Sequence, residues 1–170
     1  WVHTQESLTQ HLHRQALALR LSEVDSAALR FLIESLNDDG YLEESLQELA
    51  IALAGPDDLE QIDELVHRFT VAQRLLQTLE PVGVGARDLG ECLRLQIQAL
   101  LNDAYDDGLH QRAEVLQVAL GICSKPMDML ARRDIKRLVQ MGVGSDALVR
   151  EAIALIARLA PKPGRRFVDV

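Results

Sequence analysis

Two long apolar stretches with helical spacing are separated by a short segment that cannot be helical, and this interruption constrains the fold more than any other feature. The segment contains Pro81, Gly83 and Gly85, followed by Arg87 and Asp88. A proline disfavours helical geometry at the residue before it, so the preceding helix should end there. Glycine permits backbone angles that other residues avoid. Asp88 is followed three residues later by a glutamate, which is the spacing of a capping box. The sequence therefore predicts a helix, a rigid elbow and a second helix.

Apolar residues recur at helical spacing along nearly the whole chain, and no stretch alternates as a strand would. Ser, Asp and Pro-Gly signals mark where the helices should begin and end. We therefore expect an all-α protein of seven to nine helices. The expected ranges are 7–19, 22–36, 45–53, 58–79, 89–101, 109–122, 126–133, 135–141 and 145–159, with a polar loop over 102–108.

The net charge of −8 is unevenly distributed. Residues 1–120 carry 21 acidic and 8 basic side chains, whereas residues 121–170 carry 5 acidic and 10 basic ones. Such a division indicates two units with different electrostatic partners. We expect two packed helical subdomains, residues 1–121 and a small helix-turn-helix-like bundle over 122–164. Residues 165–170 would begin a linker to a further domain, and a first residue that is not Met suggests a fragment of a longer protein.

Patterns typical of enzymes, metal sites and membrane proteins do not occur. The glycines of the elbow do not complete a phosphate-binding G-x-G-x-x-G, because Asp88 occupies the last position. No G-x-S-x-G, H-E-x-x-H or paired-cysteine spacing is present, so we expect no catalysis, no cofactor and no metal. No run of about 18 apolar residues suggests a membrane span. Cys92 and Cys123 are far apart in apolar helical contexts, which favours reduced thiols and a cytoplasmic location.

Residues 134–159 have the form of a helix-turn-helix, which raises the alternative of a DNA-binding transcription regulator. A DNA-reading helix would carry polar or basic side chains near its start. Here the second helix begins with Ser145 and Asp146, followed by three apolar residues. The acid lies where a phosphate would repel it most strongly, so structural packing of these helices is the favoured interpretation.

The segment PVGVGARDLGECLRLQ, residues 81–96, resembles a hallmark of the sigma-54 (RpoN-type) family of bacterial RNA polymerase sigma factors. Four further segments resemble family signatures in the family's order: SLTQHLHRQ, SLNDDGYLEESLQELA, MLARRDIKRL and LAPKPG. The resemblance implies the central core-binding domain, which tethers the factor to the β and β′ subunits of core RNA polymerase. The resemblance further implies that the full-length protein has promoter DNA and a AAA+ activator ATPase as partners.

Two groups of residues are candidates for contact with polymerase. In the elbow these are Pro81, Gly83, Gly85, Arg87 and Asp88. The glycines should act through geometry, since a valine at a left-handed position costs about 1–3 kcal/mol in strain. Arg87 could either brace the turn through carbonyl groups or face the polymerase, because its guanidinium offers five donors.

The second candidate group is a basic patch consisting of Arg132, Arg133, Lys136 and Arg137. These four residues flank apolar helical positions, so we expect them to be exposed. The patch would face an acidic polymerase surface or non-specific DNA near it.

Overall fold

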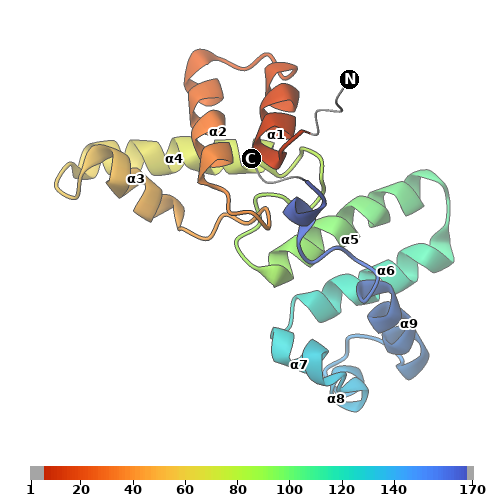
Figure 1. The fold of residues 1–170 in the computed structure, drawn as a ribbon. Helices are drawn as coiled ribbons and strands as arrows, with labels where there is room; N and C mark the ends of the chain where they lie inside the picture. Colours follow the sequence, from red (N-terminus) through yellow and green to blue (C-terminus); the bar gives the residue numbers. More distant parts are fainter. Residues whose placement is uncertain (1–5, 168–170) are drawn as a thin grey trace. The chain divides into compact units, whose positions relative to one another are not determined.

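The computed structural model describes residues 6–167, and all regular secondary structure in that range is helical. The described chain forms nine α-helices and one short 3-10 helix (Figure 1). The predicted all-α class is therefore confirmed. The helices form two compact units. Unit 1 contains the chain up to Asp88 and again from Lys162 onward, and unit 2 contains Leu89–Pro161.

This division differs from the boundary expected after residue 121. The helix that follows the elbow packs against the next helix along the chain, and both belong to unit 2. Unit 2 begins at Leu89, whereas basic residues outnumber acidic ones only after residue 120. A boundary drawn from charge therefore lies later in the sequence than the boundary drawn from packing. The expected linker also differs, because residues from Lys162 to Phe167 are assigned to unit 1.

Unit 1 is built on a long helix that contacts two others. Its helices are α1 (Leu8–Leu17), α2 (Glu23–Ser35), α3 (Leu46–Ala54) and α4 (Leu59–Leu76). Both α2 and α3 pack on α4, and α1 packs on α2 (Figure 1). Phe31 and Phe69 stack with their ring centroids 5.2 Å apart, and Phe69 is almost completely buried among leucines of the core.

Serine side chains cap the first three helices. Ser7 and Ser45 each complete a capping box, and the Ser22 hydroxyl accepts a hydrogen bond from the Asp25 amide at 3.2 Å. Each of these bonds satisfies an amide that the helix leaves without a partner. The long helix α4 ends at Leu76, three residues before the expected end, although Leu79 remains buried.

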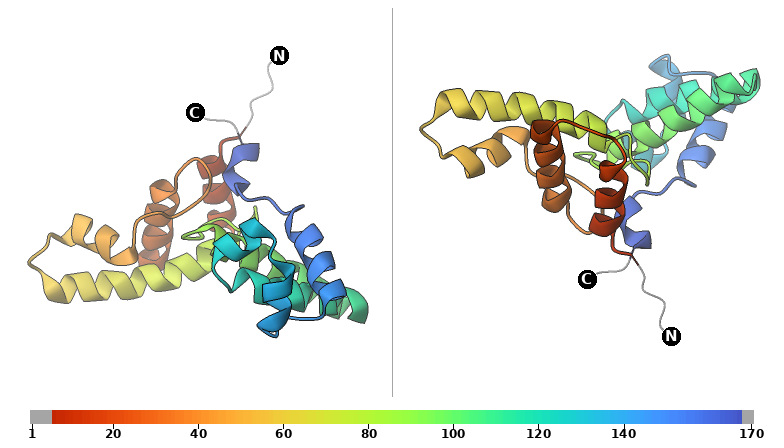
Figure 2. Two further views of the ribbon diagram at one scale, coloured as in Figure 1. Left: turned by 90° about the horizontal axis from the view of Figure 1, so that it is seen from below. Right: turned by 90° about the horizontal axis from the view of Figure 1, so that it is seen from above.

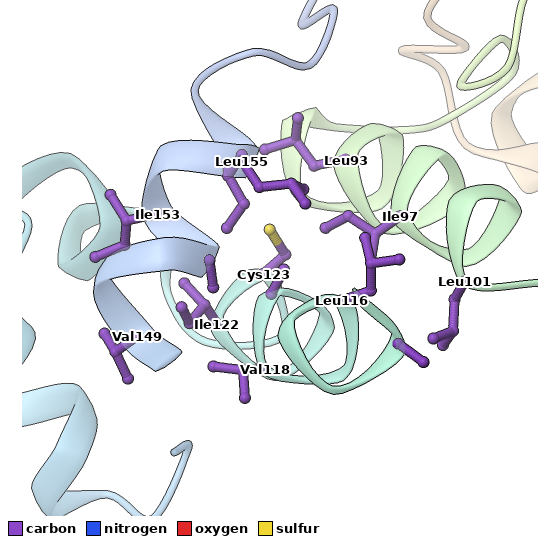
Figure 3. Packing of buried hydrophobic residues seen from close by; sticks show 14 of the residues in the cluster. Leu93, Ile97, Leu101, Leu116, Val118, Ile122, Cys123, Val149, Ile153 and Leu155 are labelled. Atoms are coloured by element: carbon purple, nitrogen blue, oxygen red, sulfur yellow. The ribbon is translucent and has the colours of Figure 1, made fainter. Parts of the chain in front are cut away.

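Unit 2 contains α5 (Leu89–Asp106), α6 (His110–Cys123), α7 (Met127–Arg132), α8 (Ile135–Gln140) and α9 (Asp146–Ile156). Its core lies where α5, α6 and α9 meet, and leucine and isoleucine side chains from all three helices converge there (Figure 3). Helix α5 continues into the segment expected to be a loop, because Leu101 and Ala104 are buried in this core. The buried Gln96 side chain donates to the Ala160 carbonyl at 2.6 Å and accepts from its amide at 3.0 Å, which ties the chain after α9 to α5.

After leaving unit 2, the chain forms the 3-10 helix Pro163–Arg166, labelled η1. This segment lies beside α1 in both views of Figure 2. The Gly164 amide donates to the Asp39 carbonyl at 2.9 Å, and the Arg165 guanidinium pairs with the Asp39 carboxylate. Phe167 packs against the His11 ring with centroids 5.0 Å apart. Residues 163–167 are therefore part of the fold of unit 1.

Substituting Gly164 tests how closely these two backbones approach. A Cβ atom at Gly164 would lie 2.8 Å from the Gly40 nitrogen and closer still to the Asp38 carbonyl oxygen, so the backbone would have to separate. We expect Gly164→Ala to lower the free energy of unfolding by about 1–3 kcal/mol in chemical denaturation.

The matched control is Gly121→Ala in the last turn of α6, where the nearest atom is a Val143 methyl at 3.4 Å. Alanine favours a helix over glycine, so stability there should be unchanged or higher. Equal stability of Gly164→Ala and the wild-type protein would contradict the close approach.

Candidate functional site

The elbow is a compact turn between α4 and α5 rather than a flexible linker. The Glu80–Pro81 bond is cis, the Val84 amide donates to the Pro81 carbonyl at 3.2 Å, and Ala86 donates to Gly83 at 3.4 Å. Both glycines of the turn have left-handed backbone angles, with φ of 103° at Gly83 and 81° at Gly85. The expectation that these glycines serve the geometry of the turn is confirmed at both positions.

Two backbone hydrogen bonds join the elbow to the turn that follows α2. The Gly85 amide donates to the Gly40 carbonyl and the Leu42 amide donates to the Ala86 carbonyl, each at 2.9 Å. Gly85 also has little room for a side chain, because the end of α4 packs against it. A Cβ there would lie 2.9 Å from two carbon atoms of Leu76.

Three glutamine side chains complete the anchoring of the elbow. The amides of Gln73 and Gln77, one turn apart at the end of α4, both donate to the Gly85 carbonyl, at 3.2 and 3.1 Å. Gln15 of α1 both accepts from the Glu80 amide at 2.9 Å and donates to its carbonyl at 2.6 Å. These three residues could not be predicted from the sequence, because a glutamine on a helix face carries no motif that reveals its distant partner.

The two charged residues of the elbow have a different placement from its glycines. Pro81, Gly83 and Gly85 are buried, whereas Arg87 and Asp88 are exposed immediately before α5 begins. The buried residues can therefore act on a partner only by setting the shape of the turn, while the two charged side chains can reach one directly. Capping of α5 by Asp88 stays a prediction.

The basic patch lies in unit 2, on the end of α7 and on α8. All four side chains are exposed, as predicted: Arg132, Arg133, Lys136 and Arg137. Arg132 pairs with Asp128 one turn earlier at 3.8 Å, a surface ion pair of little energetic weight. Within residues 6–167 the other three form no ion pair, so their charges are available to a partner.

The geometry of α8 and α9 does not favour the DNA-reading alternative. Asp146 is exposed in the first turn of α9, where a base-reading side chain would have to lie. The Arg150 Nε donates to Asp146 at 2.7 Å, so the basic residue nearest this end is held along its own helix. Ser145 caps the helix by accepting from the Leu148 amide at 3.3 Å, so its hydroxyl has a structural role.

Three other features bear on function: possible metal ligands, membrane-spanning helices and the two cysteines. Residues 6–167 contain no group of three or more His, Cys, Asp or Glu side chains placed to hold a metal ion. None of the helices in that range combines the length and apolar composition needed to span a bilayer. Both cysteines are buried and neither is in a disulfide. Burial raises the pKa of the Cys123 thiol to about 11, so this thiol stays protonated and unreactive at neutral pH.

Comparison with known families accounts for this combination of features. The family model described as "Sigma-54 factor, core binding domain" matches residues 1–170. The chain belongs to this family. The family resemblance predicted from the sequence is therefore confirmed over the whole chain.

Curated proteins named RNA polymerase sigma-54 factor are similar over most of the chain. The protein from Pseudomonas aeruginosa is 37% identical over 162 residues, covering 95% of this chain and 30% of its own length. The protein from Xanthomonas euvesicatoria is 36% identical over 165 residues, covering 97% and 32% respectively. The chain thus spans about a third of the length of the sigma-54 factors it matches.

Two contributions to the stability of the elbow, close packing and backbone angle, can be measured separately. Gly85 and Gly142 have nearly the same φ, 81° and 77°, but nothing lies within 4 Å of a Cβ at Gly142. Both alanine substitutions incur the cost of a residue with positive φ, and only Gly85→Ala also forces Leu76 to move. We expect Gly85→Ala to lower the free energy of unfolding by about 1–3 kcal/mol more than Gly142→Ala, measured by urea denaturation. Equal losses would mean that Leu76 leaves room for a side chain at the elbow.

Proposed function

We propose that this chain is the part of a sigma-54-type transcription initiation factor that binds core RNA polymerase. The observation that carries the proposal is the match of all 170 residues to the family's core binding domain. Two exposed groups of charged residues support it, because they could contact the polymerase directly. These are the basic patch and the pair Arg87 and Asp88 at the end of the elbow. The partners are the β and β′ subunits of the core enzyme.

In this proposal the chain is a tether with no catalytic step of its own. Its role is to hold the factor on polymerase in the bacterial cytoplasm, so that the whole factor can be directed to a promoter. The complete factor would also engage promoter DNA and a AAA+ activator ATPase that opens the promoter.

The contact residues are proposed in two classes. Arg87 and Asp88 of the elbow and the four cations of the basic patch are exposed and can touch polymerase directly. Pro81, Gly83 and Gly85 are buried and would contribute by holding the turn in shape. Arg87 could serve in either way, as a brace or as a direct contact.

Competition for the core enzyme tests this function directly. The 170-residue chain should displace a labelled full-length sigma-54 factor from purified core polymerase at micromolar concentration, and should support no transcription alone. Failure to displace it at that concentration would remove the proposal.

Reversing charge in the basic patch should affect association more than folding. We expect the double variant Arg133→Glu and Arg137→Glu to slow association with core polymerase at low salt, because exposed charges act mainly by steering the encounter. The rate difference should shrink as salt is added, since salt screens exposed charges. Stopped-flow association and thermal melting would measure the two effects separately.

A matched control makes the same change in net charge at two positions outside the basic patch. Arg74 and Arg112 are exposed on α4 and α6, outside the patch, and the variant Arg74→Glu with Arg112→Glu should associate nearly as fast as the wild-type chain. Equal slowing in both double variants would indicate that only net charge matters. A large drop in melting temperature for the patch variant would instead indicate an internal ion-pair network.

A further inference from the structure

A groove in unit 2 combines an apolar floor with two arginines. It lies beside the start of α8 and along α9, and has a volume of about 430 Å³. Its lining consists of Arg133, Ile135, Arg150, Ile153, Ala154 and Ala157. Small and branched apolar side chains thus line the groove together with two guanidinium-bearing residues. The basic patch continues from this groove along α7 and α8.

Arg133 occupies a backbone conformation that an arginine does not prefer. Its φ and ψ are 52° and 45°, in the left-handed region. The Arg133 amide donates to the Leu130 carbonyl at 3.0 Å, and the following amide donates to Met129 at 3.4 Å, a pattern that usually ends a helix with glycine. Among residues 6–167 only Arg20 is another non-glycine residue with positive φ.

An arginine in place of the usual glycine points to a use for the Arg133 side chain. The side chain is exposed, lines the groove and forms no ion pair within residues 6–167. An unfavourable backbone conformation with no local benefit points to a role in binding. Across the groove, Arg150 pairs only with Asp146 of its own helix, in an exposed contact that a stronger acceptor can replace.

We infer that this groove docks an acidic, amphipathic helix of core RNA polymerase, an inference that rests on the proposed function. An apolar side chain of that helix would lie against Ile135, Ile153 and Ala157. Carboxylates beside it would pair with Arg133 and Arg150, since a guanidinium binds a carboxylate through two parallel hydrogen bonds. Docking of an amphipathic helix in a groove is a common mode of recognition. Duplex DNA fits less well, because a phosphate backbone gains nothing from an apolar floor.

The decisive variant is Arg133→Gly, which relieves the backbone and removes the side chain. We expect its melting temperature to be unchanged or higher, while its affinity for purified core polymerase falls at least about fivefold. If Arg133 had only a structural role, the melting temperature and the affinity would change together. Arg20→Gly is the matched control, because it relieves the same backbone conformation in unit 1 and should leave affinity unchanged.

A second pair of variants tests the floor of the groove. Ala157→Glu places an acid among the lining residues and should weaken core binding by at least about fivefold, the loss expected at the centre of an interface. Ala147→Glu makes the same change at an exposed position of α9 outside the lining, and should bind like the wild-type chain. Plain duplex DNA is measured in parallel with all four variants.

The outcomes separate this inference from the proposed function. If the wild-type chain binds core polymerase but Arg133→Gly and Ala157→Glu bind equally well, the groove is not the docking site and the proposed function stands. If both variants lose affinity for duplex DNA and keep affinity for core polymerase, the groove serves DNA and the inference is overturned. If the wild-type chain itself fails to bind core polymerase, the proposed function fails and this inference fails with it.

Discussion

Main-chain hydrogen bonds around Gly40 hold together three segments that are distant in the sequence, and unit 1 depends on this contact. The Gly40 carbonyl accepts from the amide of Gly85 in the elbow, and the neighbouring Asp39 carbonyl accepts from Gly164 near the end of the chain. Backbones can approach this closely only where side chains are missing. Gly40 and Gly164 are therefore explained by the close approach of their two backbones, and the positive φ of Gly40 and Gly85 also favours glycine.

This contact also fixes where the chain leaves unit 1 and where it returns. The elbow, which precedes α5, and the segment that follows Pro161 are both anchored on the turn around Asp39 and Gly40. The two hydrogen bonds therefore hold the elbow and the 3-10 helix against the same turn of unit 1.

Local features of the fold could be predicted from the sequence, and distant pairings could not. Helix caps such as Ser45 with Glu48, and the non-helical elbow, were predictable because each depends on neighbours a few residues away. The elbow's partners were not, because no local pattern shows that Gln73 donates to Gly85. The extension of α5 through Ala104 was also missed, because burial in a tertiary core outweighed a polar, loop-like sequence. The left-handed Arg133 departs from the glycine expected at such a helix end, so only the structure could reveal it.

Amide hydrogen exchange tests most directly whether the three segments are held by their backbones. The account predicts that the amides of Leu42, Gly85 and Gly164 exchange as slowly as core amides of α2, although all three lie outside regular α-helix. It also predicts that their protection is lost together when Gly164 is replaced by alanine, since each depends on the same contact. Exchange of these amides at rates typical of exposed loops, while α2 remains protected, would contradict the account.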